Sequence, residues 1–252
     1  MEIAGRTVLV TGGARGVGRE LTRQLVDLGA TVVAVGRDQA RLDALVAEHG
    51  ARVRPHVVDL ADPVATAEFA DRLVEWHPEL SVVINNAGIQ SLTDFLDGDP
   101  VATRATVRAE IAVNLDAVVT LCGALLPHLR GQESAAIVNV TTGLALAPKA
   151  TAPVYCATKS AVRTFTRALG YQCRTGAPHV RVVDAVFPLV DTDMTRGRGK
   201  AGIKKISAAE AAAAVLAGVR RDRAVVHVGA TSLLAGIMRV APGLGYRIMR
   251  DS

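Results

Sequence analysis

Seven short runs rich in β-branched residues recur along the chain, and longer amphipathic segments separate them. These runs predict strands at 7–10, 31–35, 52–58, 81–84, 136–140, 180–186 and 224–228. Between the first two, residues 18–29 carry Leu21, Leu25 and Leu28 on one side and end at Gly29, which predicts a helix buried along one face. Strands that are apolar on both faces and alternate with helices form a parallel sheet covered on both sides. The sequence therefore predicts a doubly wound α/β fold with a seven-stranded, mostly parallel sheet and helices on both faces.

The length of the chain favours one domain over several. A chain of 252 residues, half of them hydrophobic, is long enough to bury one large core, and no repeat or linker interrupts the alternation. The motif "SAAE" at 207–210 has the pattern of a capping box that begins the last major helix. We expect a single domain over 1–252.

The net charge of +5 is unevenly distributed along the sequence. The part from Arg196 to the end carries a net +8, so the rest carries −3. Nucleic-acid binding is not expected, because no aromatic residues interleave with the basic ones and no binding module is recognisable. A solvated basic face is one interpretation, and attraction of an anionic substrate to the cluster at 195–205 is the other.

The sequence does not favour a membrane protein or a disulfide-stapled one. No apolar run of about 18 residues is free of charges and glycines, and the N-terminus lacks the pattern of a signal peptide. Cys122, Cys156 and Cys173 are widely spaced and odd in number, so neither a disulfide framework nor a metal cluster is expected. The prediction is a cytoplasmic protein without a bound metal.

The apolar C-terminal stretch 231–252 favours contact with a second subunit over a membrane surface, because Pro242 and nearby glycines interrupt its periodicity.

A glycine-rich turn follows the first strand and leads into the first helix. The stretch "TGGARGVG" (11–18) allows the backbone to turn tightly and to approach a pyrophosphate, while the helix N-terminus offers unpaired N–H groups. Glycine-rich turns also follow strands for steric reasons alone. The strand and helix on either side favour a nucleotide cradle of the Rossmann type.

The second strand ends in Gly36 and Arg37, where an acid would accept hydrogen bonds from the ribose of NAD(H). Without that acid, a 2′-phosphate could pair with Arg37 and with Arg15 from the first turn. NADP(H) is therefore favoured over NAD(H), although the adjacent Asp38 argues the other way. Asp59, at the end of the third strand, is placed either to meet an adenine edge or to close a turn.

Several motifs occur in the order found in a known family. They are "TGGARGVG", "NNAG" (85–88), Asn114 and "YCATK" (155–159), and with them the whole chain resembles the single-domain short-chain dehydrogenases/reductases. The resemblance implies an NADP(H)-dependent oxidoreductase acting on a small carbonyl or alcohol substrate, with a homodimer or homotetramer as its assembly. It further implies a set of cofactor-binding residues: Gly12, Arg15, Gly16, Val17, Gly18, Arg37, Asp59, Leu60, Asn86, Ala87, Gly88, Tyr155, Lys159, Pro188, Val190 and Thr192.

Tyr155 and Lys159 stand four residues apart, so on a helix they share a face. An unperturbed phenol has a pKa near 10, and a cation about 4 Å away lowers it by up to about three units before screening. The pair could also be an ordinary surface pair, but its context favours proton transfer to a substrate oxygen.

Thr142 stands where the family has a serine that hydrogen-bonds the substrate carbonyl, and Asn114 would complete a catalytic tetrad with Thr142, Tyr155 and Lys159. Thr141 is the weaker candidate, because strand alternation points it to the other face. Asn114 could instead satisfy a neighbouring backbone group.

The segment after the sixth strand, "FPLVDTDM" (187–194), keeps the Pro188, Val190 and Thr192 of the family's cofactor-binding turn but carries Phe187 where relatives have a second proline. We expect residues 192–206 to cover the substrate and Leu144 and Met194 to line its pocket, with Leu146 as a further wall. Two other functions remain open: a nucleotide-sensing protein without turnover, and epimerase or dehydratase chemistry on the same fold.

Overall fold

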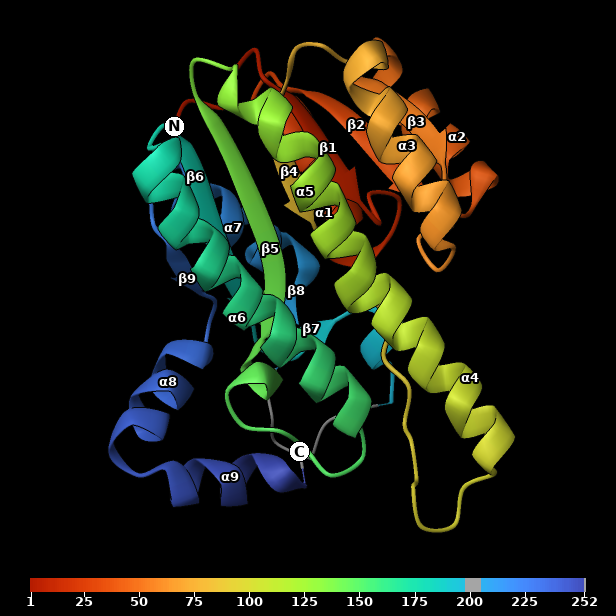
Figure 1. Cartoon of the computed structure of the whole chain (residues 1–252), viewed down its shortest axis with the longest axis vertical. Coiled ribbons are helices and arrows are strands. Elements are labelled where there is room, and N and C mark those ends of the chain that lie inside the picture. Colours follow the sequence, from red (N-terminus) through yellow and green to blue (C-terminus); the bar gives the residue numbers. More distant parts are fainter. Residues whose placement is uncertain (198–204, 252) are drawn as a thin grey trace.

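The computed structural model describes residues 1–197 and 205–251, and its centre is a seven-stranded sheet in the order β3-β2-β1-β4-β5-β6-β9 (Figure 1). All six neighbouring pairs run parallel. The strands are β1 (Thr7–Thr11), β2 (Thr31–Gly36), β3 (Val53–Val57), β4 (Leu80–Asn85), β5 (Ala135–Thr142), β6 (Val180–Phe187) and β9 (Val225–His227). All seven predicted strands are confirmed, and the predicted doubly wound fold with them.

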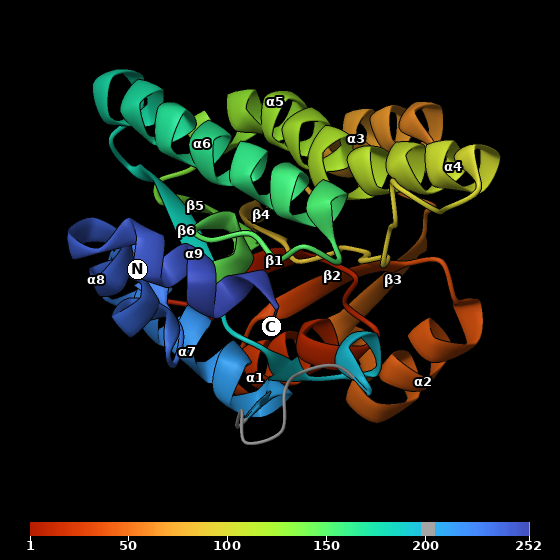
Figure 2. The same cartoon turned by 90° about the horizontal axis from the view of Figure 1, so that it is seen from below.

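Helices cover both faces of this sheet and make three layers (Figure 2). One face is covered by α3 (Pro63–Trp76), α5 (Ala117–Arg130) and α6 (Pro153–Gly176), and the other by α1 (Gly16–Asp27), α2 (Gln39–His49) and α7 (Ala208–Arg220). Two hydrophobic clusters fill the spaces between sheet and helices. Because β1, β4 and β5 are buried along their whole length, apolar residues occupy both faces of each strand and do not alternate regularly with polar ones.

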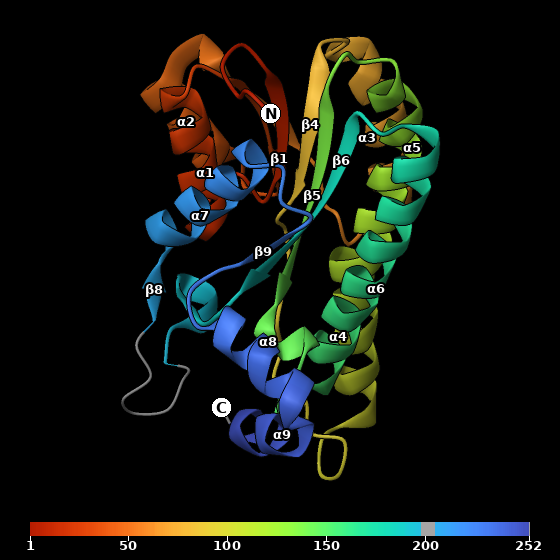
Figure 3. The same cartoon turned by 90° about the vertical axis from the view of Figure 1, so that its left-hand side faces the viewer.

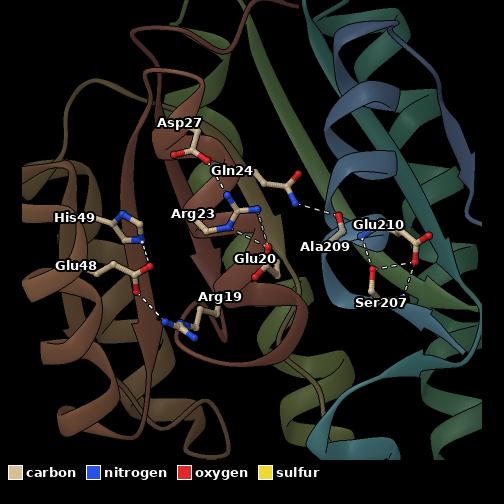
Figure 4. A network of polar contacts seen from close by, with 10 residues as sticks. All are labelled: Arg19, Glu20, Arg23, Gln24, Asp27, Glu48, His49, Ser207, Ala209 and Glu210. Atoms are coloured by element: carbon tan, nitrogen blue, oxygen red, sulfur yellow. Dashed lines mark hydrogen bonds and ion pairs between the residues drawn. The ribbon is translucent and has the colours of Figure 1, made fainter.

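Local signals in the sequence explain where several helices begin. The side chains of Asp38, Asp62 and Asp99 accept hydrogen bonds from the first backbone amides of the helices they precede. The predicted capping box at α7 is present, because Ser207 accepts from the Glu210 backbone while the Glu210 carboxylate accepts from the Ser207 amide (Figure 4). The amide of Gln24 donates to the carbonyl of Ala209 at 3.0 Å and so joins α1 to the start of α7 (Figure 4).

α4 (Pro100–Ile111) continues into α5 through one wide turn of π-helix at Ala112–Asp116. Such a turn holds one residue more than an α-helical turn and often marks a functional site. The combined helix, Pro100–Arg130, is long and apolar enough to cross a membrane by length and composition alone. Since α5 packs on α3 and much of the apolar window is buried inside the protein, we interpret it as a core helix.

Two short elements lie beyond the main sheet at the carboxyl end of β6. β7 (Val190–Asp191) and β8 (Ile206–Ser207) pair in parallel, so the described ends of the predicted substrate-covering segment lie side by side (Figure 1). Residues 198–204 of that segment lie outside the described part of the chain. The C-terminal helices α8 (Thr231–Val240) and α9 (Pro242–Arg250) pack on each other (Figure 3), and α8 also contacts the turn that follows β5.

Candidate active site

A cleft of about 1170 Å³ lies at the carboxyl ends of the sheet strands, around the neighbours β1 and β4, where the strand order of the sheet reverses. In an open parallel sheet this is the crevice in which ligands bind. Most of the predicted site residues line it: Gly12, Arg15, Gly16, Val17, Arg37, Asp59, Leu60, Asn86, Ala87, Gly88, Thr142, Tyr155, Lys159, Pro188, Val190, Thr192 and Met194. Gly18, Asn114 and Leu144 are not among the lining residues.

The glycine turn between β1 and α1 has the backbone that a dinucleotide requires. Gly12 has a φ of +65°, and a side chain at Gly18 would come within 2.0 Å of the carbonyl oxygen of Gly12. At the start of α1, Arg15 makes no side-chain cap and the first turn contains no acid. The partial positive charge of the helix N-terminus is therefore not neutralised by a side chain there and can attract an anion. The turn therefore fits the pyrophosphate of a dinucleotide.

The segment Asn85–Gly88 is tied to this turn by Thr11, to which the sequence reasoning assigned no role. The hydroxyl of Thr11 accepts hydrogen bonds from the backbone amides of Asn86 and Ala87, each at 3.0 Å. The Asn86 side chain donates in return to the Thr11 carbonyl at 3.0 Å. These bonds hold the ends of β1 and β4 together at the floor of the cleft.

The end of the cleft beyond β2 is rich in arginine. Arg37 lies 3.8 Å from Asp59, and both side chains are about half exposed. Asp38, which argues against NADP(H), lines the same cleft, and its side chain caps α2 and pairs with Arg41 at 3.0 Å. Arg41 also lines the cleft, and the sequence reasoning missed it. Its position three residues after the capping Asp38 is the signal that would have placed it there.

Asp59 closes a turn, which is one of the two roles that the sequence left open, because its carboxylate accepts from the amide of Ala61 at 3.0 Å. It also lines the cleft, and its contact with an adenine edge stays a prediction.

Tyr155 lies in the first turn of α6 and Lys159 one turn later, and both line the cleft. The ammonium of Lys159 donates to the carbonyl oxygen of Val140 at 3.0 Å, and only 3% of this residue is exposed. Burial lowers the pKa of Lys159 to about 8, and the negative charge of Asp184 opposes that shift. The helix thus presents a phenol and a deeply buried amine to the same cleft.

Thr142 and Thr141 end β5 and point to opposite faces, as strand alternation predicts. Both residues line the cleft, and the hydroxyl of Thr142 accepts from the amide of Leu144 at 3.3 Å. Thr141 donates to the carboxylate of Asp184 on β6, which also receives the guanidinium of Arg163 at 2.7 Å. The sequence reasoning missed the pair Asp184 and Arg163, because nothing in a single sequence brings α6 and β6 together.

Asn114 lies in the π-helical turn and is completely buried. Its side chain accepts from the amide of Ile89 at 2.8 Å and donates to the Ile89 carbonyl at 2.9 Å, so it satisfies a neighbouring backbone group, as the alternative interpretation expected. It is nevertheless close to the cleft. A side chain at Gly88 would come within 3.3 Å of the Asn114 amide oxygen and 3.4 Å of the Lys159 nitrogen.

The segment after β6 closes the cleft on the side of α1. A side chain at Gly16 would come within 3.3 Å of the methyl group of Thr192, which places Thr192 against the glycine turn. Thr192 and Thr195 form a reciprocal cap around a short 3-10 turn that carries Met194. Phe187 is buried in the core and lines the cleft where it meets Pro188.

Comparisons with known proteins place these features among relatives. A family model described as short chain dehydrogenase matches residues 6–202. The oxidoreductase DltE of Bacillus subtilis (strain 168) is 38% identical over 216 residues, which are 81% of this chain and 79% of that protein. The L-xylulose reductase of Homo sapiens is 36% identical over 190 residues, or 75% of this chain and 72% of the relative. Among solved structures, a short chain dehydrogenase from Burkholderia cenocepacia J2315 in complex with NADP superposes with a TM-score of 0.84 at 27% identity, over 100% of both chains.

Proposed function

Because the chain belongs to the short-chain dehydrogenase family, we propose that it is an NADP(H)-dependent oxidoreductase that interconverts a carbonyl and an alcohol substrate. The observation that carries this proposal is the convergence of Tyr155, Lys159 and Thr142 on one cleft that also contains the glycine turn. The NADP-bound relative and the arginines beyond β2 support the choice of NADP(H) over NAD(H).

The cofactor would lie along the floor of the cleft. The glycine turn and the N-terminus of α1 would hold the pyrophosphate, and Arg15 and Arg37 would pair with the 2′-phosphate. Asp59 and Leu60 would border the adenine, and Asn86, Ala87 and Gly88 the central part. Pro188, Val190 and Thr192 would hold the nicotinamide end, with Tyr155 and Lys159 at its ribose.

The chemistry that a bound nicotinamide supplies is hydride transfer to a carbonyl carbon or, in reverse, from an alcohol carbon. The phenol of Tyr155 donates the proton to the substrate oxygen in the direction of reduction. The hydroxyl of Thr142 donates a hydrogen bond to that oxygen and stabilises its developing negative charge. Lys159 favours the phenolate form of Tyr155, because a buried positive charge lowers the pKa of a nearby phenol. Asn114 positions the Ile89 backbone and Gly88 behind Lys159.

The substrate pocket would be bounded by Met194 and Leu144, with the cleft-lining residues 192–195 along its edge. The sequence 195–205 carries five basic residues, which make a carbonyl compound with an anionic group the substrate class that we propose. We further propose that the chain works as one domain within a homodimer or homotetramer in the cytoplasm.

The test mixes the protein with NADPH and a panel of ketones and aldehydes, with and without a carboxylate or phosphate, and follows the loss of nicotinamide absorbance. Consumption of NADPH by at least one carbonyl compound is the expected result. NADPH that binds tightly and is never consumed would favour nucleotide sensing. Conversion of a substrate with no net change in NADPH would favour epimerase or dehydratase chemistry.

A further inference from the structure

A closed ring of interactions joins the carboxyl end of β5, which lines the cleft, to α6 and β6. Lys159 of α6 donates to the carbonyl of Val140, and the next residue of β5, Thr141, donates to the carboxylate of Asp184. Asp184 also accepts from Arg163, which lies one helical turn beyond Lys159 on α6. The ring is closed through the backbone of that turn.

The members of this ring are withdrawn from solvent. Asp184 is 5% exposed and Thr141 1%, and the ion pair between Asp184 and Arg163 has side-chain exposures of 7% and 18%. A buried carboxylate is costly unless it is paired and hydrogen-bonded, and here its two oxygens receive one hydroxyl and one guanidinium. Arg163 could pair with an exposed acid at lower cost, so the buried position of Asp184 calls for a role beyond stability.

We propose that Asp184 is a positioning residue of this site, whose carboxylate holds the end of β5 against α6 and helps Lys159 to keep its proton. The inference deepens the proposed function, and as a statement about catalysis it depends on that function. Through Thr141 the carboxylate fixes the residues on either side, Val140, which receives the Lys159 ammonium, and Thr142, whose hydroxyl lines the cleft.

The charges around the ring predict the direction in which each substitution changes the pKa of Lys159. Asp184 is faced by Arg163 and Arg167 of α6 and by His227 of β9, and Asp184 is itself the charged group that acts on Lys159. Removing the carboxylate would therefore make Lys159 lose its proton more easily. Removing Arg163 would act in the opposite direction, since one cation fewer would lie near a second cation.

The experiment titrates Lys159 directly by NMR in protein labelled with [ε-13C]lysine. The chain contains only five lysines, so the spectrum is simple, and Lys159→Met identifies the signal by its loss. Asp184→Asn should lower the titration midpoint of Lys159 by about half a unit to one unit, and Arg163→Gln should raise it by a similar or smaller amount. Asp27→Asn, which removes an exposed carboxylate paired with Arg23 on α1, on the opposite face of the sheet, is the matched control and should leave the midpoint unchanged.

Shifts of opposite sign separate tuning from mere packing, because a loosened structure would not move the midpoint in both directions. A midpoint that stays the same in both variants, or that moves the same way in both, overturns the proposal. If Asp184→Asn does not fold, Arg163→Gln alone decides the matter by the direction of its shift. The NMR readout requires no turnover, so a failure of the proposed function would be recognised separately, by the absence of any carbonyl substrate.

Discussion

The ammonium nitrogen of Lys159 lies 3.0 Å from the carbonyl oxygen of Val140, at the end of β5 that opens into the cleft. This contact gives a buried cation one fixed partner and sets it on the floor of the site, one helical turn from Tyr155. Its removal from water has effects on both stability and chemistry.

The stability of the protein should depend on the titration of Lys159. Its pKa falls from 10.5 to about 8 on burial, so between these values the unfolded chain binds more protons than the folded one. The contribution of Lys159 to the free energy of unfolding therefore increases as pH rises from about 8 to 10.5, by up to about 3 kcal/mol. Lys159→Met should remove that contribution.

Buried thiols act in the opposite direction over the same range, because burial raises the pKa of Cys122 to about 12 and also raises those of Cys156 and Cys173. The measurement is therefore the difference between wild type and Lys159→Met in the free energy of unfolding by urea, followed across that range. Lys205→Met, at a partly exposed lysine, is the control. A difference that does not vary with pH would rule out the assigned shift.

Tyr155→Phe should reduce turnover by at least about a hundredfold, because the variant keeps the ring and loses the proton donor. The affinity for NADPH, measured by quenching or by calorimetry, should change little. Tyr171→Phe on the exposed side of the same helix serves as the matched variant and should turn over normally. Equal activity in both variants would contradict the role given to Tyr155.

Thr142→Val should lower turnover by about 10- to 1000-fold, since it keeps the branched shape but removes the hydroxyl that would meet the substrate oxygen. Thr142→Ser should restore most of the activity. Steady-state kinetics of both variants against the wild type provide the measurement. A valine variant as active as the serine variant would show that the hydroxyl serves only to cap the turn after β5.

Arg37→Ala should shift cofactor preference from NADP toward NAD, with NADPH binding about 10- to 100-fold weaker, because it removes one charge-assisted partner of a 2′-phosphate. The measurement is the ratio of the dissociation constants for NADPH and NADH. Arg19→Ala removes an arginine that pairs with Glu48 on α2 and does not line the cleft, so it should leave the ratio unaltered. An unchanged ratio in Arg37→Ala would assign the preference to other residues.

Gly18→Ala should weaken NADPH binding and destabilise the fold, because its new methyl group would lie 2.0 Å from the backbone oxygen of Gly12. Thermal unfolding with and without NADPH measures both effects. Gly123→Ala adds the same methyl group to α5 where nothing lies within 4 Å, and it should be neutral or stabilising by up to about 1 kcal/mol. A normal melting temperature and NADPH response in Gly18→Ala would contradict the packing described for the turn.

The sequence predicted those parts of the fold that have a strong local pattern. The main strands and the capping box at Ser207 were visible because apolar runs and capping motifs act over a few residues. β7 and β8 were missed because strands of two residues have no periodicity to detect.

In the candidate site, too, contacts within one helix could be predicted from the sequence and contacts between distant elements could not. Tyr155 and Lys159 could be paired from their spacing, whereas the partner of Lys159 proved to be a backbone carbonyl, which no sequence pattern marks. The association of Thr141, Asp184 and Arg163 joins three elements that are separate in the sequence, so only the tertiary structure reveals it.

The π-helical turn at Ala112–Asp116 contains Asn114 and takes in one residue more than a turn of the α-helices on either side. Loss of one residue here would leave a regular α-helical turn, so α4 and α5 would keep nearly the same rotational phase while the side chains within the turn moved. The Asn114 amide could then no longer meet the backbone of Ile89, although α5 kept its contacts with α3. A shortening at this position would therefore detach the helix from the backbone beside the cleft without disturbing how either half of the helix packs.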